Sequence, residues 1–105
     1  ATQVFDEVDA GIGGRTASAV GALIRKLAGS GQALCVTHLA QVAVFADEQL
    51  RVVKADEEQR TTVRTDRLDA EGRVDEVARM LGGQVSKSSR AHAAELLREA
   101  AQTRH

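Results

Sequence analysis

The sequence predicts an α/β fold in which a partly parallel sheet is followed by a β-hairpin and C-terminal helices. A strand, a helix and a second strand follow one another within residues 2–36, which is the size of a βαβ unit. Two strand-like runs then flank an acidic stretch, which is typical of a hairpin. The last third of the chain twice carries apolar residues at helical spacing.

The first strand is expected at Thr2–Phe5, and it runs directly into the acidic pair Asp6 and Glu7. No helix or loop precedes it, which predicts that the chain is a fragment of a longer protein. The segment Ala10–Gly14 follows, and its three glycines permit the backbone angles of a tight turn.

A helix is expected from Arg15 to about Ala28, because four apolar residues recur at positions i, i+3, i+4 and i+7. These residues are Val20, Leu23, Ile24 and Leu27. Gly29 follows the helix and is expected to end it in the left-handed conformation.

The second strand is expected at Ala33–Val36, which is a continuous apolar run followed by Thr37 and His38. An unbroken apolar run favours a strand that is buried on both faces, as in a parallel sheet. A right-handed crossover would place it beside the first strand. The carboxyl ends of both strands would then meet at one edge of the sheet.

A short helix is expected from Leu39 to about Ala46, followed by the two strands of the hairpin at Gln49–Lys54 and Thr61–Leu68. The acidic stretch Asp56–Glu58 is expected to form the solvated turn between them. We see no internal repeat and no low-complexity linker, so the chain is read as one compact α/β piece.

Two helices are expected in the last third of the chain. The first is expected to end at the pair Gly82 and Gly83, and Ser89 is expected to be the N-cap of the second. The apolar positions of the two helices are Val74, Val77, Ala78 and Leu81, and then Ala93, Leu96, Leu97 and Ala100.

Composition excludes several classes of protein. The 105 residues are 43% hydrophobic and 28% charged, which is typical of a globular domain. The net charge of −1 gives no basic field that would attract nucleic acid to the chain itself. No apolar run approaches the length of about 20 residues that spans a membrane. The single Cys35 excludes an internal disulfide and predicts a reducing, cytoplasmic location.

The acidic pair Asp6 and Glu7 is the first candidate site. Two adjacent carboxylates repel each other, which favours a nearby cation or polar ligand. Asp6 is a candidate ligand for Mg²⁺, which binds one or two carboxylates together with substrate phosphates. Glu7 is placed to orient and polarise an attacking water molecule. The alternative is that the acidic pair only begins a loop.

His38 is the second candidate, because it is expected at the same sheet edge as Asp6 and can donate a hydrogen bond to a terminal phosphate. A histidine with a purely structural role is the alternative. The third candidate is the loop that contains Asp9 and Gly11, which can approach another backbone across a subunit interface. A flexible connection from strand to helix is its alternative.

These residues resemble a known family. The segment Val4–Glu7 looks like the Walker B motif of ABC-type ATPases, residues 9–14 lie where their D-loop lies, and Thr37-His38 lies at their switch histidine. More narrowly, residues 5–14 (FDEVDAGIGG) and 35–43 (CVTHLAQVA) resemble the RecN family of SMC-like DNA repair ATPases. Residues 73–83 (RVDEVARMLGG) and 91–97 (AHAAELL) resemble the C-terminal tail of that family.

The resemblance implies that residues 1–105 are the C-terminal half of a P-loop ABC-type ATPase head. It implies that Asp6 helps to bind Mg²⁺, Glu7 is the catalytic base for ATP hydrolysis, and His38 contacts the γ-phosphate. Asp9 and Gly11 would meet the opposing head when two heads of a homodimer enclose ATP. The implied function is repair of DNA double-strand breaks by recombination, in the cytoplasm and at the nucleoid.

The sequence also departs from the family. Gln3, Gly13 and Ala40 differ from the residues expected at their positions, although none is a proposed catalytic group. The chain has no G-x-x-x-x-G-K-[ST] phosphate loop, no Leu-Ser-Gly-Gly signature and no coiled-coil heptads. It is therefore expected to need the remainder of its own head for hydrolysis, and DNA would be bound through the full-length protein. The alternatives are a non-catalytic dimerisation or docking module, and a head fragment of another SMC-like or ABC-type ATPase.

Overall fold

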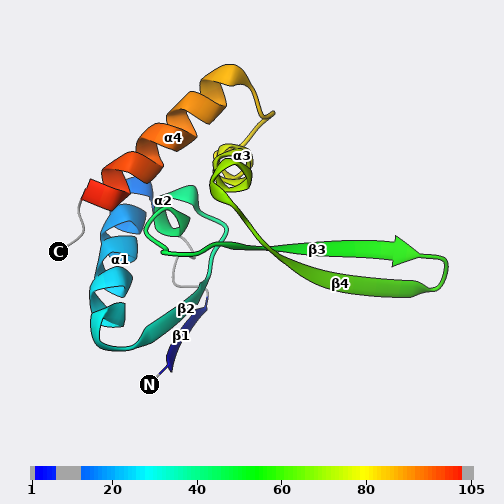
Figure 1. Cartoon of the computed structure of the whole chain (residues 1–105), viewed down its shortest axis with the longest axis horizontal. Coiled ribbons are helices and arrows are strands. Elements are labelled where there is room, and N and C mark those ends of the chain that lie inside the picture. The colour runs from blue at the N-terminus through cyan, green and yellow to red at the C-terminus, as the bar shows by residue number, and fades with distance from the viewer. Residues whose placement is uncertain (1, 7–12, 103–105) are drawn as a thin grey trace.

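The computed structural model describes residues 2–6 and 13–102. In Figure 1 the helices and the first two strands form the body, and the hairpin of the last two strands projects from it. The α/β fold class is confirmed. The elements in chain order are β1 (Thr2–Asp6), α1 (Gly14–Leu27), the 3₁₀ turn η1 (Ala28–Ser30), β2 (Gln32–Val36), α2 (Ala40–Ala43), β3 (Leu50–Glu57), β4 (Arg60–Arg67), α3 (Ala70–Met80) and α4 (Lys87–Gln102).

Strands β1 and β2 form a parallel pair, as the sequence predicts. Their register runs from Thr2 opposite Gln32 to Asp6 opposite Val36, and α1 lies between the two strands in the chain. Both strands therefore end at the same edge of this small sheet.

One face of the β1–β2 sheet is exposed. Val4, Leu34 and Val36 remain 65%, 50% and 56% exposed, whereas Ala33 and Cys35 on the other face are half-buried. The expectation that β2 is buried on both faces is therefore wrong for the part of the chain that the structure describes. The apolar sequence is that of a covered strand, but the described elements cover only one of its faces.

Helix α1 begins at Gly14 and ends at Leu27, within one residue of the predicted bounds. Its buried positions are the small residues Ala17 and Gly21, whereas Leu23 and Leu27 are about half exposed. The predicted apolar stripe is therefore only partly covered in the described chain, since Val20 and Ile24 are half-buried. Gly29 does not end the helix in the left-handed conformation, because it lies within the 3₁₀ turn that continues from α1.

The hairpin is longer than predicted. Strands β3 and β4 pair antiparallel from Leu50 opposite Arg67 to Glu57 opposite Arg60. The acidic stretch therefore belongs mostly to β3, and a two-residue turn of Glu58 and Gln59 joins the strands. Glu58 has a φ of 48°, a left-handed conformation that is uncommon for residues other than glycine. The prediction of a turn over residues 56–58 was wrong for its first two residues.

Helix α3 begins and ends as capped helices do. The Asp69 side chain accepts a hydrogen bond of 2.7 Å from the Gly72 amide at the N-terminus. At the other end, Gly82 and Gly83 have φ values of 90° and 145°, which confirms that this glycine pair terminates the helix.

Helix α4 is capped differently from the prediction. The helix begins at Lys87, so Ser89 lies inside its first turn. The Ser86 hydroxyl accepts a hydrogen bond from the Ser89 amide at 3.1 Å, and the Ser89 hydroxyl accepts one from the Ser86 amide at 2.8 Å. This exchange has the form of a capping box, and Ser86 is the N-cap.

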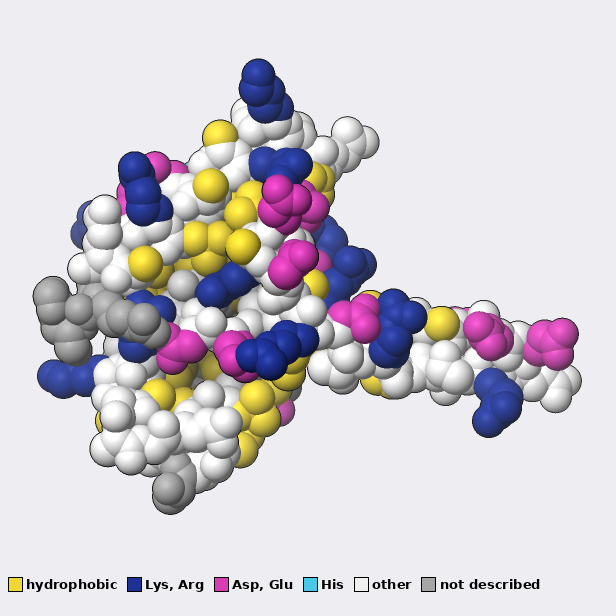
Figure 2. All heavy atoms as spheres, in the orientation of Figure 1, with side chains coloured by type: hydrophobic (Ala, Val, Ile, Leu, Met, Phe, Trp, Pro, Cys, Tyr) yellow, Lys and Arg dark blue, Asp and Glu magenta, His cyan; other side chains and the backbone are white. Residues whose placement is uncertain are grey.

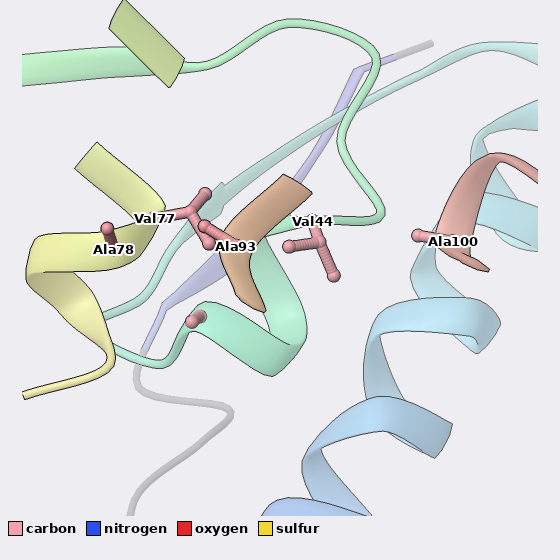
Figure 3. Close-up of a cluster of buried hydrophobic side chains, with 6 residues drawn as sticks. Val44, Val77, Ala78, Ala93 and Ala100 are labelled. Carbon is pink, nitrogen blue, oxygen red and sulfur yellow. The ribbon is translucent and has the colours of Figure 1, made fainter. Parts of the chain in front are cut away.

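The buried core lies where α2, α3 and α4 meet. Val77 is fully buried, and it packs with Val44 and Ala93 among small side chains (Figure 3). The predicted apolar faces of α3 and α4 are confirmed. The full cluster is Ala40, Val44, Val77, Ala78, Ala93 and Ala100.

The surface carries both signs of charge. On the face shown in Figure 2, basic and acidic side chains are interspersed along the projecting hairpin. In residues 2–6 and 13–102, none of the helices combines the length and the apolar character that a membrane span requires.

Candidate functional site

The candidate site is the edge of the sheet at which β1 and β2 end. Asp6 is the last residue of β1 and lies opposite Val36, which is the last residue of β2. His38 follows Val36 by two residues, and the side chains of both Asp6 and His38 are exposed. Parallel pairing therefore brings an acidic residue and a histidine to the same edge.

The connection from β2 to α2 fixes the main chain on both sides of His38. The Thr37 hydroxyl accepts a hydrogen bond of 3.0 Å from the Leu39 amide. The Ala43 amide donates a hydrogen bond of 3.1 Å to the Leu39 carbonyl. His38 therefore lies between Thr37 and Leu39, and both of these residues are held by hydrogen bonds.

Three of the predicted site residues lie outside the described residues. They are Glu7, Asp9 and Gly11. The structure describes Asp6 and His38 and gives the register that relates their strands. The roles of all five residues remain predictions.

Helix α2 has only four residues, Ala40–Ala43, and most of it is buried. Ala40 and Val44 belong to the core that also contains Val77 of α3. A single helical turn is not stable by itself in water, because nucleation is unfavourable. The position of α2 therefore depends on the groups that pack against it and bond to its ends.

Arg73 of α3 binds the C-terminal end of α2. Its Nη2 atom donates hydrogen bonds to the carbonyl oxygens of Ala43, Val44 and Ala46 at 3.0, 3.3 and 2.6 Å. Its Nε atom donates to Gln49 Oε1 at 3.1 Å. Burial lowers the pKa of the Arg73 guanidinium below its usual value, and the positive charge of Arg25 lowers it further.

Arg25 connects α1 to the last turn of α4 and to the residues after α2. Its Nη1 atom donates a hydrogen bond of 2.7 Å to the carbonyl of Ala100, and its Nη2 atom lies 3.8 Å from Asp47 Oδ1. The guanidinium carbon lies 5.8 Å from the centre of the Phe45 ring, which is a cation–π distance.

A cavity of about 300 Å³ lies between α1, α3 and α4. Arg25 and Arg73 contribute to its wall, and the rest of the lining is alanine, valine and leucine. Neither Asp6 nor His38 lines it. The cavity is therefore separate from the candidate site.

Among the described residues, Asp6 contributes a carboxylate at the sheet edge of the candidate site. Within residues 2–6 and 13–102, no cluster of three or more His, Cys, Asp or Glu side chains is suited to holding a metal ion. The exposed Asp6 carboxylate fits the smaller requirement of Mg²⁺, which retains several waters and binds one or two carboxylates together with phosphate oxygens.

Sequence reasoning assigned no role to Arg73 or Gln49. Gln49 is only 9% exposed, and it is separated from Arg73 by 24 residues in the chain. Neither residue belongs to a local pattern of charge or hydrophobicity that marks it as buried. The polar contact between them depends on how α3 packs against the end of α2.

The fold and the candidate site together define an α/β segment whose parallel strands end in an acidic residue and, just beyond the second strand, a histidine. No family model matches the chain. The chain is homologous to the C-terminal part of the RecN proteins.

Three relatives illustrate the match. The DNA repair protein RecN of Vibrio cholerae is 52% identical over 95 residues, which is 90% of this chain and 17% of the relative. The DNA repair protein RecN of Streptomyces coelicolor is 50% identical over 100 residues, covering 94% of this chain and 18% of the relative. The DNA repair protein RecN of Bacillus subtilis is 42% identical over 102 residues, covering 96% and 18%. The chain thus spans less than a fifth of the length of these curated relatives.

Proposed function

We propose that this chain is part of an ATP-binding and ATP-hydrolysing head of a RecN-like protein that acts in DNA double-strand break repair and recombination. The relatives support the DNA repair role, since each is described as a DNA repair protein. The observation that carries the ATPase assignment is the parallel register, which brings Asp6 and His38 to one sheet edge. Ligands of open α/β sheets bind at such edges.

Each candidate residue has a distinct chemical role in this proposal. The Asp6 carboxylate holds Mg²⁺, which supplies positive charge at the phosphate oxygens when it is bound. The Glu7 carboxylate orients the attacking water and accepts its proton. The His38 imidazole hydrogen-bonds the γ-phosphate of ATP. Because positioning and electrostatics account for most of the catalysis of phosphoryl transfer, a small displacement of any of these groups would slow the reaction.

The remainder of the same ATPase head is the first proposed partner. The exposed apolar face of β1–β2, made by Val4, Leu34 and Val36, is the surface we expect it to cover. The second proposed partner is another head in a homodimer, which would be met by the loop containing Asp9 and Gly11. DNA is proposed to bind through the full-length protein.

The test is the substitution Glu7→Gln in the full-length protein that contains this sequence. We expect ATP hydrolysis to fall by about 10²–10⁴-fold, because the amide cannot accept the proton from water. Binding of ATP should persist. Glu57→Gln, in an exposed residue at the end of β3, is the matched control and should hydrolyse ATP at the rate of the unchanged protein. Unchanged hydrolysis in Glu7→Gln would remove Glu7 from the proposed mechanism.

A non-catalytic docking module is the second candidate function, and the exposed apolar face of β1–β2 favours it equally. Mixing the chain with the remaining part of the head discriminates between the two functions. Restored Mg²⁺-dependent ATP hydrolysis supports the ATPase head. Stable association of the two parts without hydrolysis supports the docking module.

A further inference from the structure

Helix α2 is joined directly to the residues that carry the candidate site. The chain passes from the end of β2 through Thr37 and His38 into Leu39, the N-cap of α2. Only one residue separates His38 from the helix. A rotation or shift of α2 would therefore move the main chain of His38.

The start of α2 is held from within the same segment. Leu39 donates its amide to the Thr37 hydroxyl, and no side chain caps the helix at its N-cap. The helix is four residues long, so its own hydrogen bonds are few. Contacts at its other end and in the core also fix its orientation.

The Arg73 side chain binds the other end of α2. The last carbonyls of a helix have no partner within the helix, and cations are favoured beside them. The Arg73 guanidinium donates to three carbonyls in this region, from Ala43, Val44 and Ala46. Its fixed planar fork can serve several acceptors at once, which an ammonium group on a flexible chain does less well.

Arg73 is itself fixed by its surroundings. Its Nε atom bonds to the buried Gln49 side chain at 3.1 Å. It stands in the first turn of α3, whose residue Val77 packs in the same core as Ala40 and Val44. The position of α3 is thus transmitted to the end of α2 both by packing and by hydrogen bonds.

We propose that Arg73 is a positioning residue, which holds α2 and thereby the main chain at His38 in the arrangement required for hydrolysis of ATP. The inference rests on the proposed function. Arg73 has no direct contact with the reacting groups in this proposal. It acts through α2, and its effect on the reaction is therefore an effect on His38.

The experiment is a double-mutant cycle in the full-length protein, with Arg73→Met, His38→Ala and the combination of both. We expect Arg73→Met to lower kcat for ATP hydrolysis by about 10- to 100-fold, because a misplacement of about 1 Å costs up to about 10²-fold. The KM for ATP should change less than kcat. If Arg73 acts through His38, the double variant should be no slower than His38→Ala alone.

Two further variants and one structural readout complete the design. Arg73→Lys keeps the charge and should recover part of the lost kcat. Arg98→Met is the matched control, because Arg98 is exposed on α4 and its guanidinium pairs with Glu95 on the same helix, so it should leave hydrolysis unchanged. Hydrogen exchange of the peptide covering residues 37–46 should be faster in Arg73→Met than in Arg98→Met.

Distinct results overturn the inference and the proposed function. If His38→Ala slows hydrolysis but Arg73→Met does not, or if the two effects multiply in the double variant, Arg73 does not act through His38. Unchanged hydrogen exchange at residues 37–46 would also overturn the inference. If Glu7→Gln and His38→Ala both leave hydrolysis unchanged, the proposed function fails and the inference fails with it.

Discussion

The substitution Gly21→Ala tests the close approach of α1 to the segment after α2. A Cβ atom built at Gly21 would lie 2.5 Å from Phe45 Cδ2 and 3.2 Å from both Cγ and Cε2 of the same ring. Carbon atoms pack best at about 3.5–4.0 Å, so the ring or the helix must shift by about 1 Å. Gly21 is buried, which leaves little free space for that shift.

The magnitude follows from two opposing terms. Replacing glycine by alanine inside a helix stabilises the helix by about 1 kcal/mol, because the unfolded chain loses conformational freedom. Forcing an extra methyl group into a packed site costs about 1–3 kcal/mol. The matched control is Gly29→Ala, because a Cβ atom at Gly29 meets nothing within 4 Å. That variant should be stabilised by about 0.4–1 kcal/mol.

The assay is native-state hydrogen exchange of α1 peptides in the full-length protein, which reports the free energy of local opening. We expect α1 to exchange faster in Gly21→Ala than in Gly29→Ala. A difference of about 1–3 kcal/mol corresponds to about 5- to 150-fold in the exchange rate. Equal protection in the two variants would refute the reasoning, since it would mean that the Phe45 ring moves aside without cost.

Two further predictions concern stability and association. Asp69→Ala removes the side chain that accepts a hydrogen bond from the Gly72 amide, so it should lower the stability of α3 by about 0.5–2 kcal/mol. Hydrogen exchange of residues 70–80 measures this loss, and unchanged exchange there would contradict the capping role. The 105-residue chain alone should self-associate at micromolar concentration through the exposed side chains of Val4, Leu34 and Val36. The double substitution Leu34→Thr and Val36→Thr should reduce this association in sedimentation experiments. A monomeric chain that unfolds cooperatively would contradict the second prediction.

Helical periodicity predicted the buried face of α3 but only part of the buried face of α1. In α3, Val77 and Ala78 are both apolar and buried, so pattern and packing agree. In α1, Leu23 and Leu27 are exposed, and the Phe45 ring packs closely against Gly21, which contributes nothing to an apolar stripe. Periodicity identifies the side of a helix that favours burial, but it does not identify the position at which a neighbouring side chain, here the Phe45 ring, packs against the helix backbone.

The part of the candidate site that depends on where the two parallel strands end was predictable from the sequence. The placement of Asp6 and His38 at one edge follows from two short apolar strands and the rule for parallel crossovers. The support of α2 by Arg73 was not predictable, because the bonded carbonyls lie 27 to 30 residues earlier in the chain. Contacts of this kind appear only once the helices have packed.

The buried Gln49 is explained by its place between the body and the hairpin. Its side chain accepts from Arg73 and donates to the sulfur of Met80 at 3.6 Å, and its carbonyl accepts from the Leu68 amide at 3.0 Å. Polar groups are tolerated in a core when their hydrogen bonds are satisfied, and Gln49 uses both ends of its amide.

A second connection joins the hairpin to the same helix. Glu76 of α3 is buried, and its Oε2 atom lies 3.4 Å from the Arg51 Nε atom of β3. One turn earlier on α3, Arg73 holds the end of α2. Helix α3 therefore bonds through one face to the base of the hairpin and to the helix that follows His38. Both contacts involve charged groups and are partly buried, so moving α3 relative to either partner would break hydrogen bonds that water replaces only in part. We therefore expect α2, α3 and the β3–β4 hairpin to shift together.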